Sequence, residues 1–183
     1  SNMIEAYNID NQSMRTVTAM PNEAAYAGAV IIGDEIFVVG DWWPGTNNPS
    51  VSAKGMVQIY NISTDTWRNG TPMPTTKRVG HAGVCEYGGY IWVAGGVSGS
   101  AGTDATNRTL RYDPGNDQWS EVAKMNNSKF GLALIPFGDK LYDFGGGIRT
   151  ISWGAPAPSK IVEVYDPLLD NWTQLNTTIP KAI

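Results

Sequence analysis

The segment "LRYDPGNDQWSEVAKMN", residues 110–126, is one of four related segments in this chain of 183 residues. Each segment has a tyrosine that is followed, seven residues later, by a tryptophan or, in the first segment, by Met14. The tyrosines are Tyr7, Tyr60, Tyr112 and Tyr165, at spacings of 53, 52 and 53 residues, and the tryptophans are Trp67, Trp119 and Trp172. A pattern that keeps this register along the chain indicates a structural repeat.

A second feature of the repeat is a short apolar run that ends in glycine, upstream of three of the tyrosines. Its versions are "IFVVGD" at 36–41, "IWVAGG" at 91–96 and "LYDFGG" at 141–146. A glycine-rich phosphate loop would lead into a helix, but "VSGSAGTDATNRT" at 97–109 has no helical periodicity. Because the pattern also recurs, we interpret Gly95, Gly96, Gly145 and Gly146 as structural residues of the repeat.

Each repeat unit is predicted to contain two β-hairpins. In the first hairpin an apolar run such as "HAGVCEYGG", residues 81–89, pairs with the glycine-ended run. In the second, the strand with the tyrosine pairs with the strand with the tryptophan, across residues that favour turns. Four short strands about every 50 residues, without a helix, predict a β-propeller blade. The tyrosine and tryptophan rings are expected to fill the space between neighbouring blades.

The combination of Gly95-Gly96, "YDP" at 112–114 and Trp119 resembles the Kelch motif of β-propellers, including galactose-oxidase-like central domains. The resemblance covers nearly the whole chain and departs from the motif at Asp41, which replaces a glycine, and at Met14, which replaces a tryptophan. It implies an all-β, Kelch-type β-propeller that is incomplete, with about three and a half four-stranded blades.

The repeat also predicts how the propeller array is divided. The expected units are a half blade of two outer strands at 3–21 and full blades at 22–74, 75–126 and 127–183. Four to eight blades usually close a ring, so the end blades are expected to expose edges and apolar surface. Self-association through these edges is therefore expected.

Composition limits the classes of partner. The net charge of −4 and the lack of a Lys/Arg run argue against nucleic acid and anionic membranes. Cys85 is the lone cysteine, so no intrachain disulfide or cysteine-based metal cluster is expected. We assign no cofactor and no metal. Asn-x-Ser/Thr occurs seven times, which fits a secreted glycoprotein, but asparagine also favours turns, so a secreted and a cytoplasmic location both stay open.

In an up-down-up-down blade, the connection between the second and third strands lies on the same face as the connection into the next blade. These connections differ strongly from one another in sequence, as loops that carry specificity do. We therefore predict a ligand-binding face made of aromatic side chains and a rim of hydrogen-bonding groups. Its candidate residues are Asp41, Trp42, Trp43, Arg78, His81, Lys129, Arg149 and Trp153.

Two residues depart from the repeat pattern. Asp143 occupies the place of Val38 and Val93 in the other repeats, and a buried carboxylate must find hydrogen-bond donors. We expect neighbouring loop N–H groups to supply them, and a catalytic or ligand-binding role is the alternative. His81, which aligns with Tyr26 and Gly131, either faces a ligand or caps the edge of its blade.

The expected function is a non-catalytic binding module for a protein or glycan ligand. The alternative is part of a Kelch-propeller enzyme, a sugar epimerase or oxidase-like protein, that lacks some of its site. An oxidase-type copper site would use two histidines, and the chain has only His81. An epimerase needs acids, bases and an arginine, but no spacing brings together Arg78, Glu86, Asp143 and Arg149, so no catalytic residue is assigned. A purely structural array is the third possibility.

Overall fold

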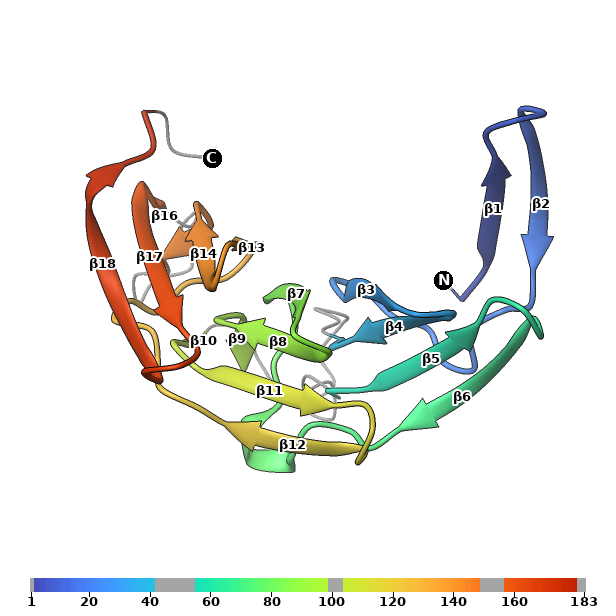
Figure 1. Cartoon of the computed structure of the whole chain (residues 1–183), viewed down its shortest axis with the longest axis horizontal. Helices are drawn as coiled ribbons and strands as arrows, with labels where there is room; N and C mark the ends of the chain where they lie inside the picture. Colours follow the sequence, from blue (N-terminus) through green and yellow to red (C-terminus); the bar gives the residue numbers. More distant parts are fainter. Residues whose placement is uncertain (1, 42–54, 99–103, 149–156, 181–183) are drawn as a thin grey trace, which may run out of the picture.

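The computed structural model describes residues 2–41, 55–98, 104–148 and 157–180. Within these ranges, antiparallel sheets stand side by side along an arc (Figure 1). Three of these sheets have four strands each, and a two-stranded hairpin precedes them. The predicted all-β architecture of three four-stranded blades and one half blade is therefore confirmed.

The strands follow one another in the order that the repeat predicts. The leading hairpin is β1 (Ile4–Asn8) and β2 (Ser13–Val17), and the first sheet is β3 (Gly28–Ile32), β4 (Glu35–Val39), β5 (Val57–Asn61) and β6 (Thr66–Gly70). The second sheet is β7 (Gly83–Tyr87), β8 (Tyr90–Ala94), β11 (Thr109–Asp113) and β12 (Gln118–Glu121), and the third is β13 (Ala133–Phe137), β14 (Lys140–Phe144), β17 (Ile161–Asp166) and β18 (Asn171–Thr178). In each sheet the first strand lies on the inner side of the arc and the last on the outer side (Figure 1).

Shorter elements lie in the connections between these strands. They are the 3₁₀ helix η1 (Thr75–Lys77), the pair β9 (Val97–Ser98) with β10 (Asp104–Ala105), and the pair β15 (Gly147–Ile148) with β16 (Ala157–Pro158). Each two-stranded pair begins directly after a glycine pair, so it extends the hairpin beyond the sheet.

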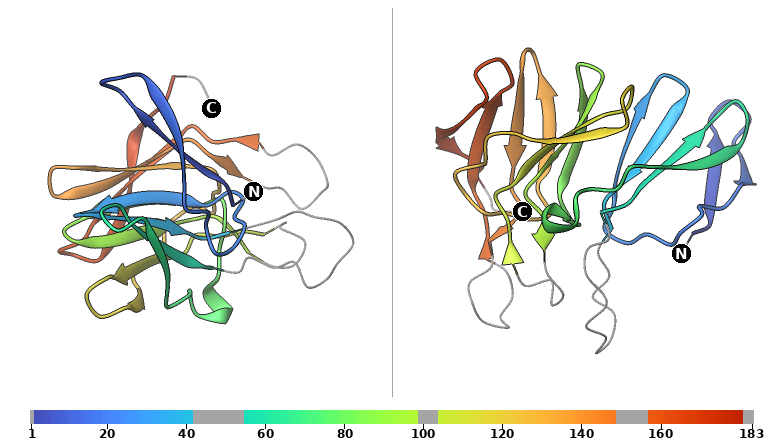
Figure 2. Two further views of the ribbon diagram at one scale, coloured as in Figure 1. Left: turned by 90° about the vertical axis from the view of Figure 1, so that its right-hand side faces the viewer. Right: turned by 90° about the horizontal axis from the view of Figure 1, so that it is seen from below.

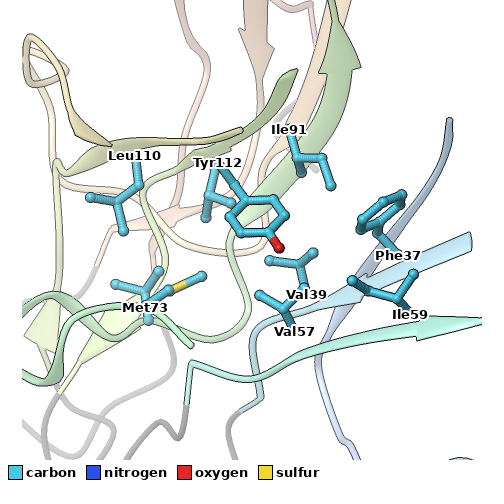
Figure 3. Packing of buried hydrophobic residues seen from close by; sticks show 10 residues of the cluster. Phe37, Val39, Val57, Ile59, Met73, Ile91, Leu110 and Tyr112 are labelled. Carbon is cyan, nitrogen blue, oxygen red and sulfur yellow. The ribbon is translucent and has the colours of Figure 1, made fainter. Parts of the chain in front are cut away.

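The hydrophobic core consists of two layers, one between each pair of neighbouring four-stranded sheets. In the first layer, Phe37 and Ile59 of the first sheet pack with Ile91 and Tyr112 of the second (Figure 3). The second layer joins the second sheet to the third and includes Cys85, Trp92, Leu134, Leu141, Tyr165 and Trp172. Burial raises the pKa of the Cys85 thiol to about 12, so this thiol is a core residue and is not ionised near neutral pH.

The repeated tyrosine and tryptophan lie directly opposite each other on neighbouring strands. Tyr60 pairs with Trp67, and the same register joins Tyr112 to Trp119 and Tyr165 to Trp172. The ring centroids of these pairs are 5.0–5.2 Å apart. In the leading hairpin Tyr7 keeps this register opposite Met14, but both side chains are more than half exposed. The expectation that Tyr7 fills an inter-blade space is therefore wrong for the described part of the chain.

Each tryptophan binds a backbone residue at the exit of the preceding outer strand. The Trp119 indole Nε1 donates to the carbonyl of Thr71 at 2.8 Å, and the amide of the same threonine donates to Asp117 Oδ1 at 2.7 Å. The Tyr112 hydroxyl also donates to Asp117. We call this set of bonds from one tryptophan and one aspartate to a single backbone residue the inter-sheet clasp.

The inter-sheet clasp recurs in the neighbouring repeats. The residues held are Thr18, by Asp65 and Trp67, and Ala123, by Asp170 and Trp172. The hydroxyls of Tyr60 and Tyr165 bind Asp65 and Asp170 at 2.6 and 2.7 Å. Both backbone groups of each held residue are therefore paired. These bonds join the leading hairpin to the first sheet, the first sheet to the second, and the second sheet to the third.

Gly95 and Gly96 lie where the backbone of another segment leaves no room for a side chain. At Gly96, where φ is +94°, a Cβ atom would lie 2.8 Å from the carbonyl oxygen of Gly80. At Gly95, where φ is +67°, it would lie 2.4 Å from the carbonyl oxygen of Lys129 in the connection to the next sheet. Side chains at these positions would separate backbones that are in contact, so glycine is required at both positions by packing.

Replacing Trp172 with alanine should lower the free energy of unfolding by about 3–5 kcal/mol, because the indole is buried and its removal leaves a cavity. Leu168, which is 93% exposed in the turn before β18, provides the control, and Leu168→Ala should change stability by less than about 0.5 kcal/mol. Urea unfolding of both variants measures the difference. Equal losses would show that the indole does not hold the sheets together.

The inter-sheet clasp also predicts a loss of stability in acid. The Tyr112 hydroxyl, followed by the Thr71 amide and hydroxyl, lowers the pKa of Asp117. A carboxyl with a lowered pKa stabilises the fold above its unfolded value and loses that contribution as pH falls through the folded pKa. Asp117→Asn should therefore destabilise by roughly 1 kcal/mol near neutral pH and reduce the acid dependence below about pH 4. Thermal unfolding against pH tests this, with the exposed turn residue Asp10 changed to asparagine as the control. An Asp117 variant that behaves like the control would contradict it.

Candidate functional site

Backbone bridges join Gly80 to Val97 and Phe130 to Gly147. In the second and third sheets, the described part of the connection into the sheet therefore lies against the start of the connection between its second and third strands. The pairs β9–β10 and β15–β16 project from this side, away from the hairpin turns (Figure 2). We call this side, which carries the bridges and the two short strand pairs, the loop face.

Trp42, Trp43, Arg149 and Trp153 lie outside the described residues. Their contribution to a ligand-binding face stays a prediction.

Asp41 does not lie on an exposed rim. Its side chain is buried, and Oδ1 accepts a hydrogen bond from the amide of Ala25 at 3.0 Å. In the second repeat, the residue at this position is Gly96, next to the backbone bridge. The carboxylate of Asp41 therefore joins two connections of the loop face, and the expectation that it is accessible is wrong.

Arg78 is half-buried and packs along the connection before β7. Its Nε donates to the carbonyl of Met73 at 3.4 Å, and its stem lies over Gly55. The guanidinium therefore has a structural contact on the loop side of the first two sheets.

Lys129 was predicted at the rim and is instead fully buried. Its ammonium lies 2.6 Å from Asp143 Oδ2 and 3.6 Å from Glu163 Oε2, and it donates to the carbonyl of Ile161 at 3.2 Å. The prediction of an accessible lysine is wrong because the sequence does not show that two carboxylates from other strands meet it inside the sheet.

Asp143 is also fully buried, as predicted, but its donors are different from those expected. They are the Lys129 ammonium and the amide of Glu163 in β17, at 2.7 and 3.0 Å from Oδ1. Burial raises the pKa of Asp143 to about 6, and the Lys129 ammonium opposes this shift. A side-chain cation and a strand amide thus replace the loop N–H groups that we expected.

His81 lies at the inner edge of the loop face, two residues before β7. Its amide donates to the carbonyl of Tyr26 at 2.9 Å, and its carbonyl accepts from the amide of Gly131 at 2.7 Å. The three residues occupy equivalent positions in successive repeats and have φ values of +55°, +53° and +64°. This ladder requires the left-handed backbone conformation, which glycine adopts without strain.

The rings at this edge contact one another. The His81 ring centroid is 4.8 Å from that of Tyr26 and 5.4 Å from that of Phe130. Tyr26 is half exposed, and burial lowers the pKa of His81, so the imidazole is neutral near pH 7. We call Tyr26, His81 and Phe130 the inner-edge cluster. Sequence reasoning aligned His81 with Tyr26 but did not identify Tyr26 or Phe130 as members of the cluster.

Comparison with known proteins agrees with this geometry. The family profile of the Kelch motif matches residues 78–126. Kelch-like protein terF of Aspergillus terreus is 30% identical over 152 residues, which cover 80% of this chain and 32% of that protein. Kelch-like protein 36 of Bos taurus is 29% identical over 185 residues, which cover 98% of this chain and 28% of that protein. The chain belongs to the Kelch-repeat family.

A solved structure entitled "Structure of YjhT" superposes on this Kelch-repeat chain with a TM-score of 0.75 and 17% sequence identity. The match covers 93% of this chain and 57% of the other, and it shows a shared fold. The chain spans about a third of the length of the two curated Kelch relatives named above.

Of the groups considered for an epimerase-like site of a Kelch enzyme, Arg149 lies outside the described residues, and the other three have separate partners. Glu86 accepts the amide of Gly89 in its own hairpin turn, Asp143 pairs with Lys129 inside the third sheet, and Arg78 binds Met73. Among the described residues, no group of three or more His, Cys, Asp and Glu side chains is arranged to hold a metal ion. The described helices include none that is long and apolar enough to cross a membrane.

Lys129→Met should lower the free energy of unfolding by about 3–5 kcal/mol, because it leaves two buried carboxyl groups without their cation. Lys140→Met is the matched control, since Lys140 is partly exposed and pairs with Asp166 at the surface, and should lose under about 1 kcal/mol. Urea unfolding near neutral pH measures both variants. If Lys129→Met were as stable as Lys140→Met, the buried ion pair would not exist in solution.

Proposed function

We propose that this chain is a non-catalytic binding module that presents its loop face to a protein ligand. The contact surface would include the inner-edge cluster and the loops that flank it. The cluster draws one ring from the connection into each of three successive sheets. A ligand that contacts all three rings and the flanking loop bases would extend across several sheets, which fits a protein segment better than a single sugar.

The observation that carries this proposal is the backbone conformation of Tyr26 and His81. Both have positive φ, which costs a residue with a side chain roughly 1–2 kcal/mol. Gly131 makes the same ladder without this cost. The fold therefore requires the conformation but not these side chains, and strain of this kind is typical of functional positions.

Aromatic side chains at partly exposed positions are well suited to contact a protein. Tyr26 is 51% exposed, and tyrosine is enriched among residues that dominate binding energy. The neutral His81 imidazole can donate one hydrogen bond and accept another. Trp42, Trp43, Arg149 and Trp153, predicted on the same face, would extend the contact surface.

We propose separately that the chain self-associates through exposed apolar surface, as the sequence predicts. Phe137 and Ile135 of β13 are 76% and 47% exposed on the third sheet.

The division of the array into units at 3–21, 22–74, 75–126 and 127–183 also stays a proposal.

A double variant, Tyr26→Gly with His81→Gly, tests the binding face. Relief of strain and loss of ring contacts oppose each other, so its free energy of unfolding should stay within about 1 kcal/mol of the wild type. Binding of protein segments selected from a displayed library on the wild-type chain should weaken by about tenfold or more.

The matched control is Asn116→Ala, in the turn of the second sheet at the opposite end from the loop face, and it should leave binding unchanged. If the double variant bound normally and the Asn116 variant did not, the chosen face would be wrong. If glycan arrays gave binding that depends on Tyr26 and His81 while the displayed library gave none, the ligand would be a sugar and not a protein.

A further inference from the structure

The third sheet contains a buried cluster of three ionisable side chains. Lys129, from the connection before β13, meets Asp143 of β14 and Glu163 of β17, and all three are fully buried. In the second repeat the equivalent positions hold Val79, Val93 and Leu110, which are buried apolar residues. Three apolar residues of one repeat are thus replaced together by ionisable ones in the next. We call Lys129, Asp143 and Glu163 the charge cluster.

The charge cluster contains two carboxyl groups and one cation. The Lys129 ammonium contacts both carboxyl groups, at 2.6 Å for Asp143 and 3.6 Å for Glu163. Asp143 Oδ1 also accepts the Glu163 amide, and Glu163 Oε1 accepts the Asn126 amide at 2.7 Å. With every group ionised, one negative charge would be left uncompensated among fully buried side chains, which is strongly unfavourable.

Two carboxyl oxygens of the charge cluster are candidates for protonation, which would remove the excess negative charge. Within the described part of the chain, Asp143 Oδ2 and Glu163 Oε2 accept no hydrogen bond of good geometry, although Asp143 Oδ2 is in ion-pair contact with the Lys129 ammonium at 2.6 Å. Both face the Lys129 ammonium across ion-pair distances. An added proton on one of the two carboxyl groups would bring the net charge of the cluster to zero. Carboxyl groups that share a site commonly retain one proton in this way.

We propose that Lys129, Asp143 and Glu163 form a buried proton-binding site that takes up one proton from solvent in mildly acidic solution and releases it near neutral pH. On uptake, a carboxylate oxygen forms an O–H bond, and the net charge of the cluster changes from −1 to zero. The proposal does not depend on the proposed ligand of the loop face.

The surroundings of Asp143 support this assignment. Burial raises its pKa to about 6, the Lys129 ammonium lowers it, and the negative charge of Glu163 raises it. Lys129 and Glu163 are the charged side chains that act on this carboxyl among the described residues, and β13 places the apolar Leu134 opposite Asp143. Because the folded pKa lies above the unfolded value, the folded state binds more protons between about pH 4 and pH 6. This contribution to stability is present in mild acid and is lost as pH rises through about 6.

The charge cluster lies next to the loop face. The Lys129 carbonyl accepts the amide of Gly96 at 2.8 Å, and its amide donates to the carbonyl of Thr106 at 3.1 Å. The next residue, Phe130, belongs to the inner-edge cluster and bridges to Gly147. The residue that holds the charge cluster together therefore also fixes the bases of two loops.

The direct test is an NMR titration of the side-chain carboxyl carbons in the full chain. The Asp143 signal should titrate with a midpoint near 6. In Glu163→Gln, which removes the second negative charge, the midpoint should fall by about one unit or more. A wild-type midpoint below about 4.5, or a midpoint unchanged in Glu163→Gln, would overturn the proposal.

A second measurement keeps the test independent of whether Glu163→Gln folds. The quantity to follow is the melting temperature of the wild type minus that of Asp143→Asn. This difference should decrease by about 3–5 °C as pH rises from about 5 to 7. Asp139→Asn is the control, because Asp139 is 85% exposed, and it should follow the wild type. A constant difference between the wild type and Asp143→Asn would contradict proton uptake. If Asp143→Asn does not fold, the wild-type titration decides.

Discussion

The described structure depends on the inter-sheet clasp, in which one backbone residue at the exit of an outer strand is held through both its N–H and its C=O. At the junction of the first and second sheets, Thr71 donates to Asp117 and accepts from Trp119. These bonds join the end of β6 to the turn and the outer strand of the next sheet, at the outer side of the arc (Figure 1). Because each clasp joins neighbours only, stability is built up junction by junction, as in other repeat proteins.

The inter-sheet clasps and the glycine pairs fix the backbone and leave the side chains of the loop face free to differ. At the inner edge, the backbone ladder through Tyr26, His81 and Gly131 requires a left-handed conformation. Tyrosine and histidine adopt it at two of these positions, although glycine is sufficient at the third. The proposed function rests on this contrast between what the backbone requires and what the side chains add.

The sequence predicted the sheets well because their signal is periodic and local. The spacing of Tyr112 and Trp119 gave both the strand pairing and the repeat. It did not predict the burial of Lys129, whose partners come from β14 and β17 and depend on tertiary packing. The clasp aspartates were missed because aspartate in a turn is expected from turn chemistry alone. Their recurrence five residues after the tyrosine, at Asp65, Asp117 and Asp170, was the signal that could have found them.

Amide hydrogen exchange at Thr71 tests the inter-sheet clasp most directly. Thr71 lies just beyond β6 on an exposed stretch, so in the absence of the Asp117 bond its amide would exchange as fast as those of surface loops. The clasp predicts slow exchange, comparable to that of the strand amides of the second sheet, and loss of this protection in Asp117→Ala, which removes the acceptor of the Thr71 amide. Fast exchange of the Thr71 amide in the wild-type chain would contradict the account.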